Sequence, residues 1–575
     1  HDDRPSALAF VDQQHSWVGT RAIDTRARSV VMTLSTLSWN IAAVNNNPFE
    51  YFLTHPDPKY ISLMEGVEGF IEAPGERDVK VGSVFTQAMY DELAKRMEAQ
   101  GWDVAPVAAV WSSDLSQRTI IGGFLKDKGL GAKRLMSMPD RFTNTIDLAG
   151  GGVANRPCIT SNYDADMSTL PKWWAAWSAF MFEARLEVAV KGGGSVSKRP
   201  CDLISEIPRA KYPALSEEEE AMSVPLQALC LAVWDAVMLH IVCTLLPGGE
   251  WLGIKRSIVE ALLQKKEPRT LEILTGPCAG TDIMFLQEAR GAFKPVLSAA
   301  LGGAYAVFAP ATPSRSDQNS LVALRTAAFE AASVVDVTDQ AMSALSAEGK
   351  GKVASGDMLV LTATDKAGGR KYVLASFHGD TDGLATLPVL EAVHAVVLAH
   401  PEHVLIFGLD ANVYMKPNGD KQQGLSGFVA AAAARGYTSG WGDTWLTAGP
   451  TSYVARTFLQ PQLQKATRRA ETATKGDCNL KDFVLFPSAE LRCEAATKDN
   501  TGGTGFLENT CLPTMRFPSD HALITARLAE ISPPRKAGLR PPSLPTPSPM
   551  QVAGLVAATA FFIGKAYLES TQKLG

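Results

Sequence analysis

The apolar run His403-Val-Leu-Ile-Phe-Gly408 and the polar stretch that ends it, Leu409-Asp410-Ala-Asn412, decide the fold. A short run that is apolar at successive positions, rather than at alternate ones, is typical of a strand covered on both faces. Asp410 and Asn412 follow this run directly. In α/β proteins, functional side chains are found at the ends of strands, because the loops there lie at the surface and are not needed for packing of the core.

The same combination of an apolar strand and a polar end recurs along the chain. The run at 357–364 and the run at 371–378 flank a Gly-Gly turn and predict a β-hairpin, and a helix is expected at 386–399. Strands and helices mixed in this order predict a layered α/β fold. The runs with polar ends are 30–40 (Asn40), 282–287 (Glu288), 371–378 (His378), 482–486 (Asp482) and the strand after Asp520 and His521.

Six short motifs at these positions resemble those of the endonuclease/exonuclease/phosphatase superfamily, which includes the DNase-I-like enzymes. They occur in the family's order, and the ordered set is specific although each tripeptide alone is common. The resemblance implies a four-layered α/β sandwich, in which two packed sheets are flanked by helices. The motifs are Leu37-Ser-Trp-Asn40-Ile, Phe285-Leu-Gln-Glu288, Ser376-Phe-His378, Gly408-Leu-Asp410-Ala-Asn412, Lys481-Asp482-Phe-Val-Leu and Ser519-Asp520-His521.

The resemblance also implies a role for each polar residue. Hydrolysis of a phosphate ester needs a nucleophilic water, neutralisation of the phosphoryl charge and help for the leaving oxygen. Hard cations take oxygen ligands, so Glu288, Asn40 and Asp520 are expected to hold Mg²⁺, or Mn²⁺ in its place. The expected catalytic residues are Asp410 (orienting or deprotonating the water), Asn412 (donating to a phosphoryl oxygen), His521 (contacting the phosphate), Asp482 (holding the His521 ring) and His378 (a second cation near the phosphate or leaving group).

Two departures from the family pattern lie beside these residues. Asp380 and Asp382 follow His378 where relatives carry apolar residues, and they would bind a second cation or select the substrate. Leu409 stands as an extra residue before Asp410, which leaves the spacing to Asn412 intact. Basic residues between the fourth and fifth motifs suit either a solvated face or contact with a phosphate backbone; they are Arg456, Lys465, Arg468 and Arg469.

The resemblance covers residues 30–44 and about 280–530. The catalytic domain is expected at 30–59 and 271–530, with a large, mostly helical insertion at 60–270. Within it, Ser216 and the acids 217–220 predict a helix start that continues through the apolar stretch 226–246. That stretch is long enough to cross a bilayer, but Asp235 and His240 would be costly in lipid. A crossing would also separate Asn40 from Glu288. We therefore expect a buried core helix, and core packing rather than base or lipid stacking for Trp173, Trp174 and Trp177.

The two ends of the chain differ from the rest. Residues 1–29 form an N-terminal extension without an apolar signal-type core, and the first residue is His1 rather than methionine. Residues 531–550 are rich in proline and predict a stiff linker. Residues 551–569 are apolar and suit a transmembrane tail helix or a docking helix, with basic residues before them as on a cytoplasmic flank. An intracellular protein is expected, with its catalytic domain cytoplasmic if the tail enters a membrane.

Composition limits the function classes. With 46% hydrophobic and 20% charged residues, the 575-residue chain is neither disordered nor collagen-like nor a polytopic membrane protein, and a net charge of −5 gives no global basic field. The main expectation is a metal-dependent phosphodiester hydrolase of nuclease type. The alternatives are a phosphatase or phospholipid phosphodiesterase acting on a phosphoinositide or sphingolipid at a membrane, and a non-catalytic membrane-tethered scaffold. Nucleic acid or phospholipid is the expected partner; none is indicated for the insertion.

Overall fold

Two six-stranded sheets form the part of the chain that carries the six motifs. The computed structural model describes residues 33–42, 45–135, 145–150, 152–190, 194–312, 318–460, 463, 466 and 476–531. Within these residues, the first sheet has the order β17 (Leu491–Asp499), β18 (Leu523–Glu530), β1 (Thr33–Asn40), β6 (Ile283–Ala289), β8 (Asn319–Arg325) and β7 (Tyr305–Phe308). The second has the order β13 (Tyr437–Ser439), β16 (Asp482–Pro487), β12 (His403–Asp410), β11 (Lys371–His378), β10 (Met358–Thr364) and β9 (Val335–Asp336).

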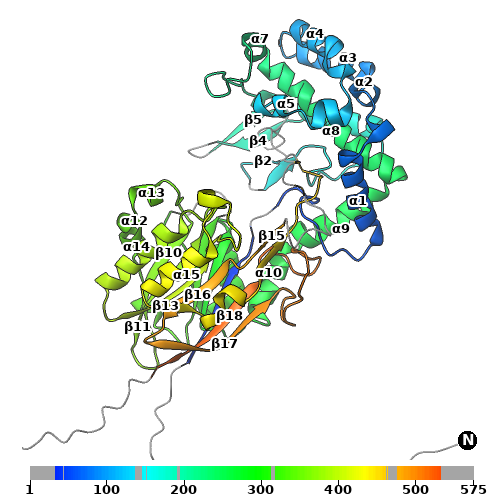
Figure 1. Ribbon diagram of the computed structural model, residues 1–575. Helices are drawn as coiled ribbons and strands as arrows, with labels where there is room; N and C mark the ends of the chain where they lie inside the picture. The colour runs from blue at the N-terminus through cyan, green and yellow to red at the C-terminus, as the bar shows by residue number, and fades with distance from the viewer. Residues whose placement is uncertain are drawn as a thin grey trace, which may run out of the picture. The chain divides into compact units, whose positions relative to one another are not determined.

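The two sheets pack face to face, and helices cover their outer faces. Phe285 of β6 lies with Leu374 of β11 and Ile406 of β12 in one buried apolar cluster between the sheets. Helices α12 (Thr338–Ala344), α14 (Thr386–Ala399) and α15 (Leu425–Ala434) cover the second sheet, as Figure 1 shows for α14 and α15. Helices α10 (Lys266–Thr275) and α11 (Phe293–Leu301) cover the first. These layers form the α/β sandwich expected from the sequence.

Strand direction brings the polar ends to one edge of both sheets. β1 and β6 are parallel, with Asn40 opposite Gln287, and β11 and β12 are parallel, with His378 opposite Asp410. β16 runs antiparallel to β12 and β18 antiparallel to β1. The carboxyl ends of four strands therefore meet the amino ends of two others. The predicted hairpin (β10 with β11) and the helix at 386–399 are confirmed.

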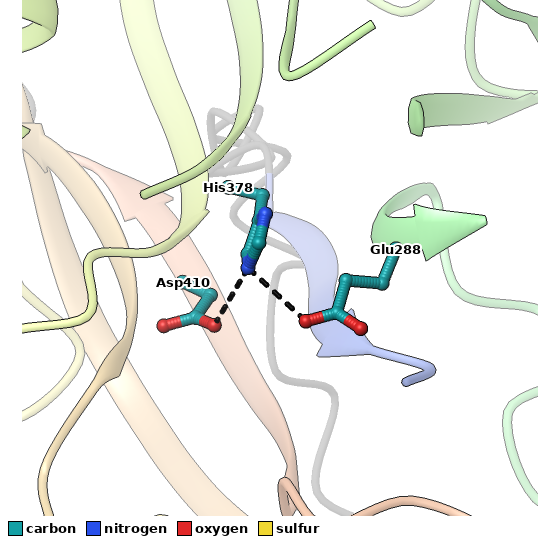
Figure 2. A group of neighbouring side chains, drawn as sticks. All are labelled: Glu288, His378 and Asp410. Atoms are coloured by element: carbon teal, nitrogen blue, oxygen red, sulfur yellow. Dashed lines mark ion pairs between the residues drawn. The ribbon is translucent and has the colours of Figure 1, made fainter. Parts of the chain in front are cut away.

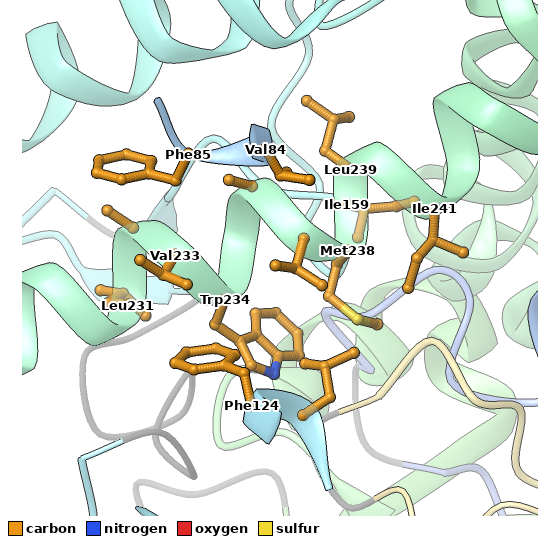
Figure 3. Packing of buried hydrophobic residues seen from close by; sticks show 14 of the residues in the cluster. Val84, Phe85, Phe124, Ile159, Leu231, Val233, Trp234, Met238, Leu239 and Ile241 are labelled. Atoms are coloured by element: carbon orange, nitrogen blue, oxygen red, sulfur yellow. The ribbon is translucent and has the colours of Figure 1, made fainter. Parts of the chain in front are cut away.

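A helical segment with its own apolar core lies between β1 and β6 in the sequence. Its long helix α8 (Ser223–Leu245) is surrounded by side chains from several elements, among them Phe85, Phe124 and Ile159 (Figure 3). Among the described residues this helix alone is long and apolar enough to span a membrane, and 78% of its most apolar window is buried in the protein. The expected burial of residues 226–246 is confirmed.

The remaining elements are short. In the helical segment they are α1 (Pro58–Glu72), α2 (Val81–Val84), α3 (Gln87–Glu98), α4 (Ala105–Ser113), α5 (Lys128–Ala132), β2 (Thr145–Asp147), β3 (Val153–Asn155), α6 (Leu170–Phe182), β4 (Leu186–Ala189), β5 (Ser195–Lys198), α7 (Glu217–Ala221), α9 (Glu250–Val259) and a π-helical turn, Glu260–Gln264. Elsewhere they are α13 (Ala347–Lys350), β14 (Ser452–Val454) and β15 (Asp477–Asn479).

A buried ion pair lies inside the helical segment. Asp235 of α8 receives hydrogen bonds from Arg156 Nε at 2.8 Å and from Trp177 Nε1 at 2.9 Å, and all three side chains are buried. Trp173 and Trp174 are buried too, so core packing is confirmed for the three tryptophans. Removing one partner of such a buried ion pair leaves an uncompensated charge, so Arg156 and Asp235 depend on each other.

One predicted helix is wrong in its extent. Ser216 caps α7 as expected, but α7 ends at Ala221 and α8 begins at Ser223, so the two are not continuous. The reason is Pro225, which has no N–H to donate to the carbonyl of Ala221 and whose ring crowds that carbonyl. Pro225 is tolerated in the first turn of a new helix, which is where it lies. The predicted extension 1–29, the linker beyond Ile531 and the tail helix 551–569 lie outside the described residues.

Candidate active site

Three titratable side chains from three strands point toward one another at the polar edge (Figure 2). His378 Nε2 lies 3.1 Å from Glu288 Oε1 and 3.8 Å from Asp410 Oδ2. Asn40 joins them, because its Nδ2 donates to Glu288 Oε1 and to Asp410 Oδ2, each at 2.9 Å. The motif residues of β1, β6, β11 and β12 therefore share one site.

A second group extends the site through Asp410. His521 Nδ1 lies 3.0 Å from Asp482 Oδ2, and His521 Nε2 lies 3.6 Å from Asp410 Oδ2. Asp482 is further held by Thr451, whose Oγ1 donates to Asp482 Oδ2 at 2.5 Å. The structure thus places Asp482 against His521, as the sequence predicted, and Asp410 between the two histidines.

The carboxylates make both histidines cationic. Burial lowers the pKa of His378, but the charges of Glu288 and Asp410 outweigh it and raise that pKa to about 9. Burial also lowers the pKa of His521, but Asp482 and Asp410 raise it well above 6.5. Near neutral pH the site therefore holds two imidazolium groups among its carboxylates, which suits the binding of a phosphate anion.

Asn412 is held at the site by its backbone and its side chain. Its N–H donates to Asp410 Oδ1 at 2.9 Å, and its Nδ2 donates to Gly379 O at 2.8 Å. Its Oδ1 accepts a hydrogen bond from Lys481 Nζ at 2.8 Å. Lys481 is only 2% exposed, and its ammonium also lies 2.6 Å from Asp477 Oδ2. Because Lys481 fixes the oxygen of the amide, the NH₂ group is the part that faces His378.

Backbone strain is concentrated at two of these residues. Glu288 has φ = 53° and Asn412 has φ = 47°, in the left-handed region that side chains other than glycine rarely adopt. The pairing of β6 with β8 shifts register between Leu286 and Ala289, so Glu288 lies in an irregularity that turns its side chain out of the strand pattern. Such strain costs about 1–3 kcal/mol per residue and typically marks functional sites.

The site offers oxygen ligands to a metal ion. Glu288 and Asp520 line the same cavity of ≈ 280 Å³. Burial raises the pKa of Asp520, the charge of His521 lowers it, and the charge of Glu288 raises it again. A divalent cation between the two carboxylates would relieve this repulsion, so the donor set fits a hard ion such as Mg²⁺. Asn40 Oδ1 accepts from Ala42 N at 2.8 Å, and its NH₂ group faces Glu288. The metal-ligand role expected for Asn40 stays a prediction.

The structure brings other residues into the site that sequence reasoning missed. Lys481 is one. Gln287 is another: its Nε2 donates to Ser376 Oγ at 3.1 Å and to Ser38 Oγ at 3.3 Å, which ties the two sheets together below the site. The signal for Gln287 was a polar residue inside the apolar run of β6. No comparable signal distinguishes Lys481 from a surface lysine.

The two acids that follow His378 make hydrogen bonds within the protein. Asp380 Oδ1 accepts from Ala385 N at 2.6 Å just before α14, and Asp382 Oδ1 accepts from Gln422 Nε2 at 3.3 Å. Arg456 is partly buried, is paired with Glu50 and lies over the ring of Tyr51. Lys465, Arg468 and Arg469 lie outside the described residues.

Residues 78–256 match a family model described as a domain of unknown function (DUF8234). No curated protein matches the sequence. Solved structures match about half of the chain, and endonuclease/exonuclease/phosphatase-family structures are among them.

Three of these structures show the extent of the similarity. The catalytic domain of human Nocturnin with bound sulfate shares 15% identity at a TM-score of 0.31, covering 48% of this chain and 89% of that one. The endonuclease/exonuclease/phosphatase from Bacteroides vulgatus shares 14% at 0.31, covering 46% and 90%. D. rerio TDP2 complexed with a single-strand DNA product shares 15% at 0.30, covering 47% and 95%.

Proposed function

We propose that this protein is a metal-dependent phosphoesterase that hydrolyses phosphodiester bonds. The observation that supports this most is the convergence of Asn40, Glu288, His378, Asp410 and His521 at one edge of two sheets. A carboxylate pair for a cation, two imidazolium groups for a phosphate and an amide donor are the groups that phosphoryl chemistry needs. A scaffold without activity would have no use for this set.

Glu288 and Asp520 would hold Mg²⁺, which would neutralise charge on the phosphoryl oxygens when bound. Asp410 is buried between His378 and His521 and accepts hydrogen bonds from Asn40 and Asn412, so it is fixed to accept a proton from, or orient, an attacking water. Asn412 directs its NH₂ group toward the site and would donate to a phosphoryl oxygen as charge develops. Asp482 keeps the ring of His521 in place for contact with the phosphate.

Nucleic acid is the favoured substrate class, with a phospholipid as the competing one. The test is to incubate the full chain with single-stranded RNA, single-stranded DNA, and vesicles containing a phosphoinositide or sphingomyelin, in Mg²⁺ and in EDTA. Cleavage of an oligonucleotide in Mg²⁺ that EDTA stops is the expected result. Asp410→Asn should remove turnover while metal binding, measured by calorimetry, persists. Hydrolysis of the vesicle lipid alone would redirect the proposal, and no hydrolysis of any substrate would refute it.

A further inference from the structure

The hairpin formed by β14 and β15 touches the candidate active site along its first strand. Thr451, directly before β14, donates from Oγ1 to Asp482 at 2.5 Å. Ser452, the first residue of β14, lies in an antiparallel bridge with His521. This side of the hairpin therefore supports the Asp482–His521 pair. The second strand, β15, leads to the other polar group of the site, the amide of Asn412.

A chain of polar contacts runs from β15 to the Asn412 amide. Asp477 Oδ2 lies 2.6 Å from Lys481 Nζ, and Nζ in turn donates to Asn412 Oδ1 at 2.8 Å. Asp477 Oδ1 accepts from Asn479 Nδ2 at 2.7 Å, and Asn479 Oδ1 accepts from Met415 N at 2.8 Å. The carboxylate of Asp477 is thus held at both oxygens, and the segment that follows Asn412 is tied to the same hairpin.

The buried ammonium of Lys481 depends on Asp477. Among the residues that the structure describes, Asp477 alone forms an ion pair with Lys481. Burial lowers the pKa of Lys481, but the charges of Asp477 and then of Asp410 outweigh burial and raise that pKa above its usual value. Burial raises the pKa of Asp477, and the charge of Lys481 lowers it again, to below its usual value. Removing one partner of such a pair leaves the other uncompensated, so Lys481 would be held less firmly without the Asp477 charge.

The orientation of the Asn412 amide decides which charge it can meet. Its oxygen and its NH₂ group are similar in size, so shape alone does not distinguish the two orientations. One N–H donates to Gly379 O at 2.8 Å, which leaves the other for a ligand. A half-turn of the amide would present its oxygen instead, and that oxygen would repel a phosphoryl oxygen. Lys481 opposes the half-turn, because an ammonium donates to the amide oxygen and has no lone pair to accept from NH₂.

We propose that Asp477 is a positioning residue of the candidate active site. It holds the Lys481 ammonium against the oxygen of Asn412, and so keeps the NH₂ group directed at the phosphate. The inference rests on the proposed phosphoesterase function and adds a dependence of the donor on β15. The hairpin that supports the His521 ring also sets the orientation of the Asn412 amide, so a displacement of the hairpin would alter both groups together.

Asp477→Asn tests the role of the charge, because the new amide keeps the shape and can still accept from Asn479. With the full chain, Mg²⁺ and an oligonucleotide substrate, it should lower kcat by about 10- to 100-fold and leave KM within about twofold. Asp477→Glu restores the charge and should recover most of kcat. The matched control is Glu348→Gln on α13, which breaks a 2.7 Å ion pair of the same spacing with Lys352 and should leave kcat unchanged.

Nuclear magnetic resonance follows the amide without turnover. The side-chain ¹H–¹⁵N signals of Asn412, assigned by their loss in Asn412→Ala, should shift in Asp477→Asn and in the same direction in Lys481→Met. They should stay in place in Glu348→Gln, and circular dichroism would show that each variant is folded. Unshifted signals in Asp477→Asn and Lys481→Met, or a kcat of Asp477→Asn within about twofold of the native value, would overturn the proposal.

The two readouts separate this proposal from the proposed function. Shifted Asn412 signals in a protein that hydrolyses no substrate would keep the positioning role of Asp477 and refute the phosphoesterase. Hydrolysis by the native protein with Asn412 signals that Asp477→Asn leaves unshifted would do the reverse.

Discussion

His378 Nε2 lies 3.1 Å from Glu288 Oε1, although the two residues belong to different sheets. This ion pair joins the end of β11 to the irregular end of β6 at the polar edge. The carboxylate of Glu288 therefore has two neighbours: it forms an ion pair with the imidazolium of His378, and it lines the cavity that Asp520 also lines. Changes at Glu288 should therefore affect metal binding and phosphate binding together.

Glu288→Gln should lower metal-dependent turnover roughly 100-fold or more, because the amide keeps the shape but loses the charge that would hold a cation. The measurement is kcat over a Mg²⁺ titration, with circular dichroism to show that the fold persists. Glu402→Gln, at an exposed glutamate paired with Lys371, is the matched control and should leave kcat unchanged. Full activity in Glu288→Gln would show that another group holds the metal.

Asp482→Asn should lower kcat by about 10²–10⁴-fold while KM changes little, because His521 loses the carboxylate that fixes its ring and its charge. Thr451→Val removes the hydrogen bond from Oγ1 to Asp482 and the two that Oγ1 accepts from the backbone N–H groups of Lys481 and Asp482. It keeps the carboxylate beside His521, so its loss should be smaller. Steady-state kinetics of the two variants would show which substitution lowers kcat more. If Thr451→Val is as damaging as Asp482→Asn, the carboxylate is not the group that matters.

Lys481 should act through Asn412. Asn412→Ala should lower kcat by about 10²–10³-fold, the usual effect of losing one donor to a developing charge. Lys481→Met should lower kcat as well, because Nζ no longer holds the amide oxygen. In the Asn412→Ala background, Lys481→Met should cause little further loss, since residues that act as a unit are not additive.

The control for this cycle is Lys371→Met, at a surface lysine of β11, and each variant is compared at a temperature where circular dichroism shows it folded. If the fold-losses in kcat of Lys481→Met and Asn412→Ala multiply in the double variant, Lys481 acts independently of the Asn412 amide.

Lys255 should make the stability of the protein rise with pH. Burial lowers the pKa of Lys255 to about 8, and its ammonium lies 2.8 Å from Tyr163 O in the helical segment. Because the folded-state pKa is below the unfolded value of 10.5, the unfolded chain binds more protons between these values, and protonation there costs stability. Between pH 7 and pH 10 the free energy of unfolding should increase by about 2.5 kcal/mol from this group.

Urea unfolding followed by tryptophan fluorescence would measure this effect as the difference between the native protein and Lys255→Met at each pH. The substitution removes the titrating group and keeps most of its length. The free energy of unfolding of the native protein, relative to that of Lys255→Met, should rise by about 2.5 kcal/mol between pH 7 and pH 10. A constant difference across this range would mean that Lys255 titrates normally.

Much of the candidate site could be predicted from local sequence. Asn40, Glu288, His378, Asp410 and Asp482 lie at strand ends because each follows or precedes an apolar run. The break between α7 and α8 is equally local in origin, because Pro225 lacks the N–H that a continuous helix would need there.

Lys481 could not be predicted in this way, and for Gln287 the sequence shows only a polar residue inside an apolar run, without its partners. Lys481 holds Asn412, which is distant along the chain, and Gln287 meets Ser38 and Ser376 from two different sheets. Which hydrogen bonds a buried polar side chain makes is known only when its partners have packed around it.

The amino-acid sequence by itself determined which runs become strands and which polar residues end them, because apolar patterning and proline act over a few neighbouring positions. Only the tertiary structure decided that β16 and β18 run against their neighbours and so add Asp482 and His521 to the same edge. It also decided that His378 is cationic and that Leu263 walls the cavity beside Glu288. These properties arise from charges and surfaces that come within a few ångströms only after segments far apart in the chain have packed.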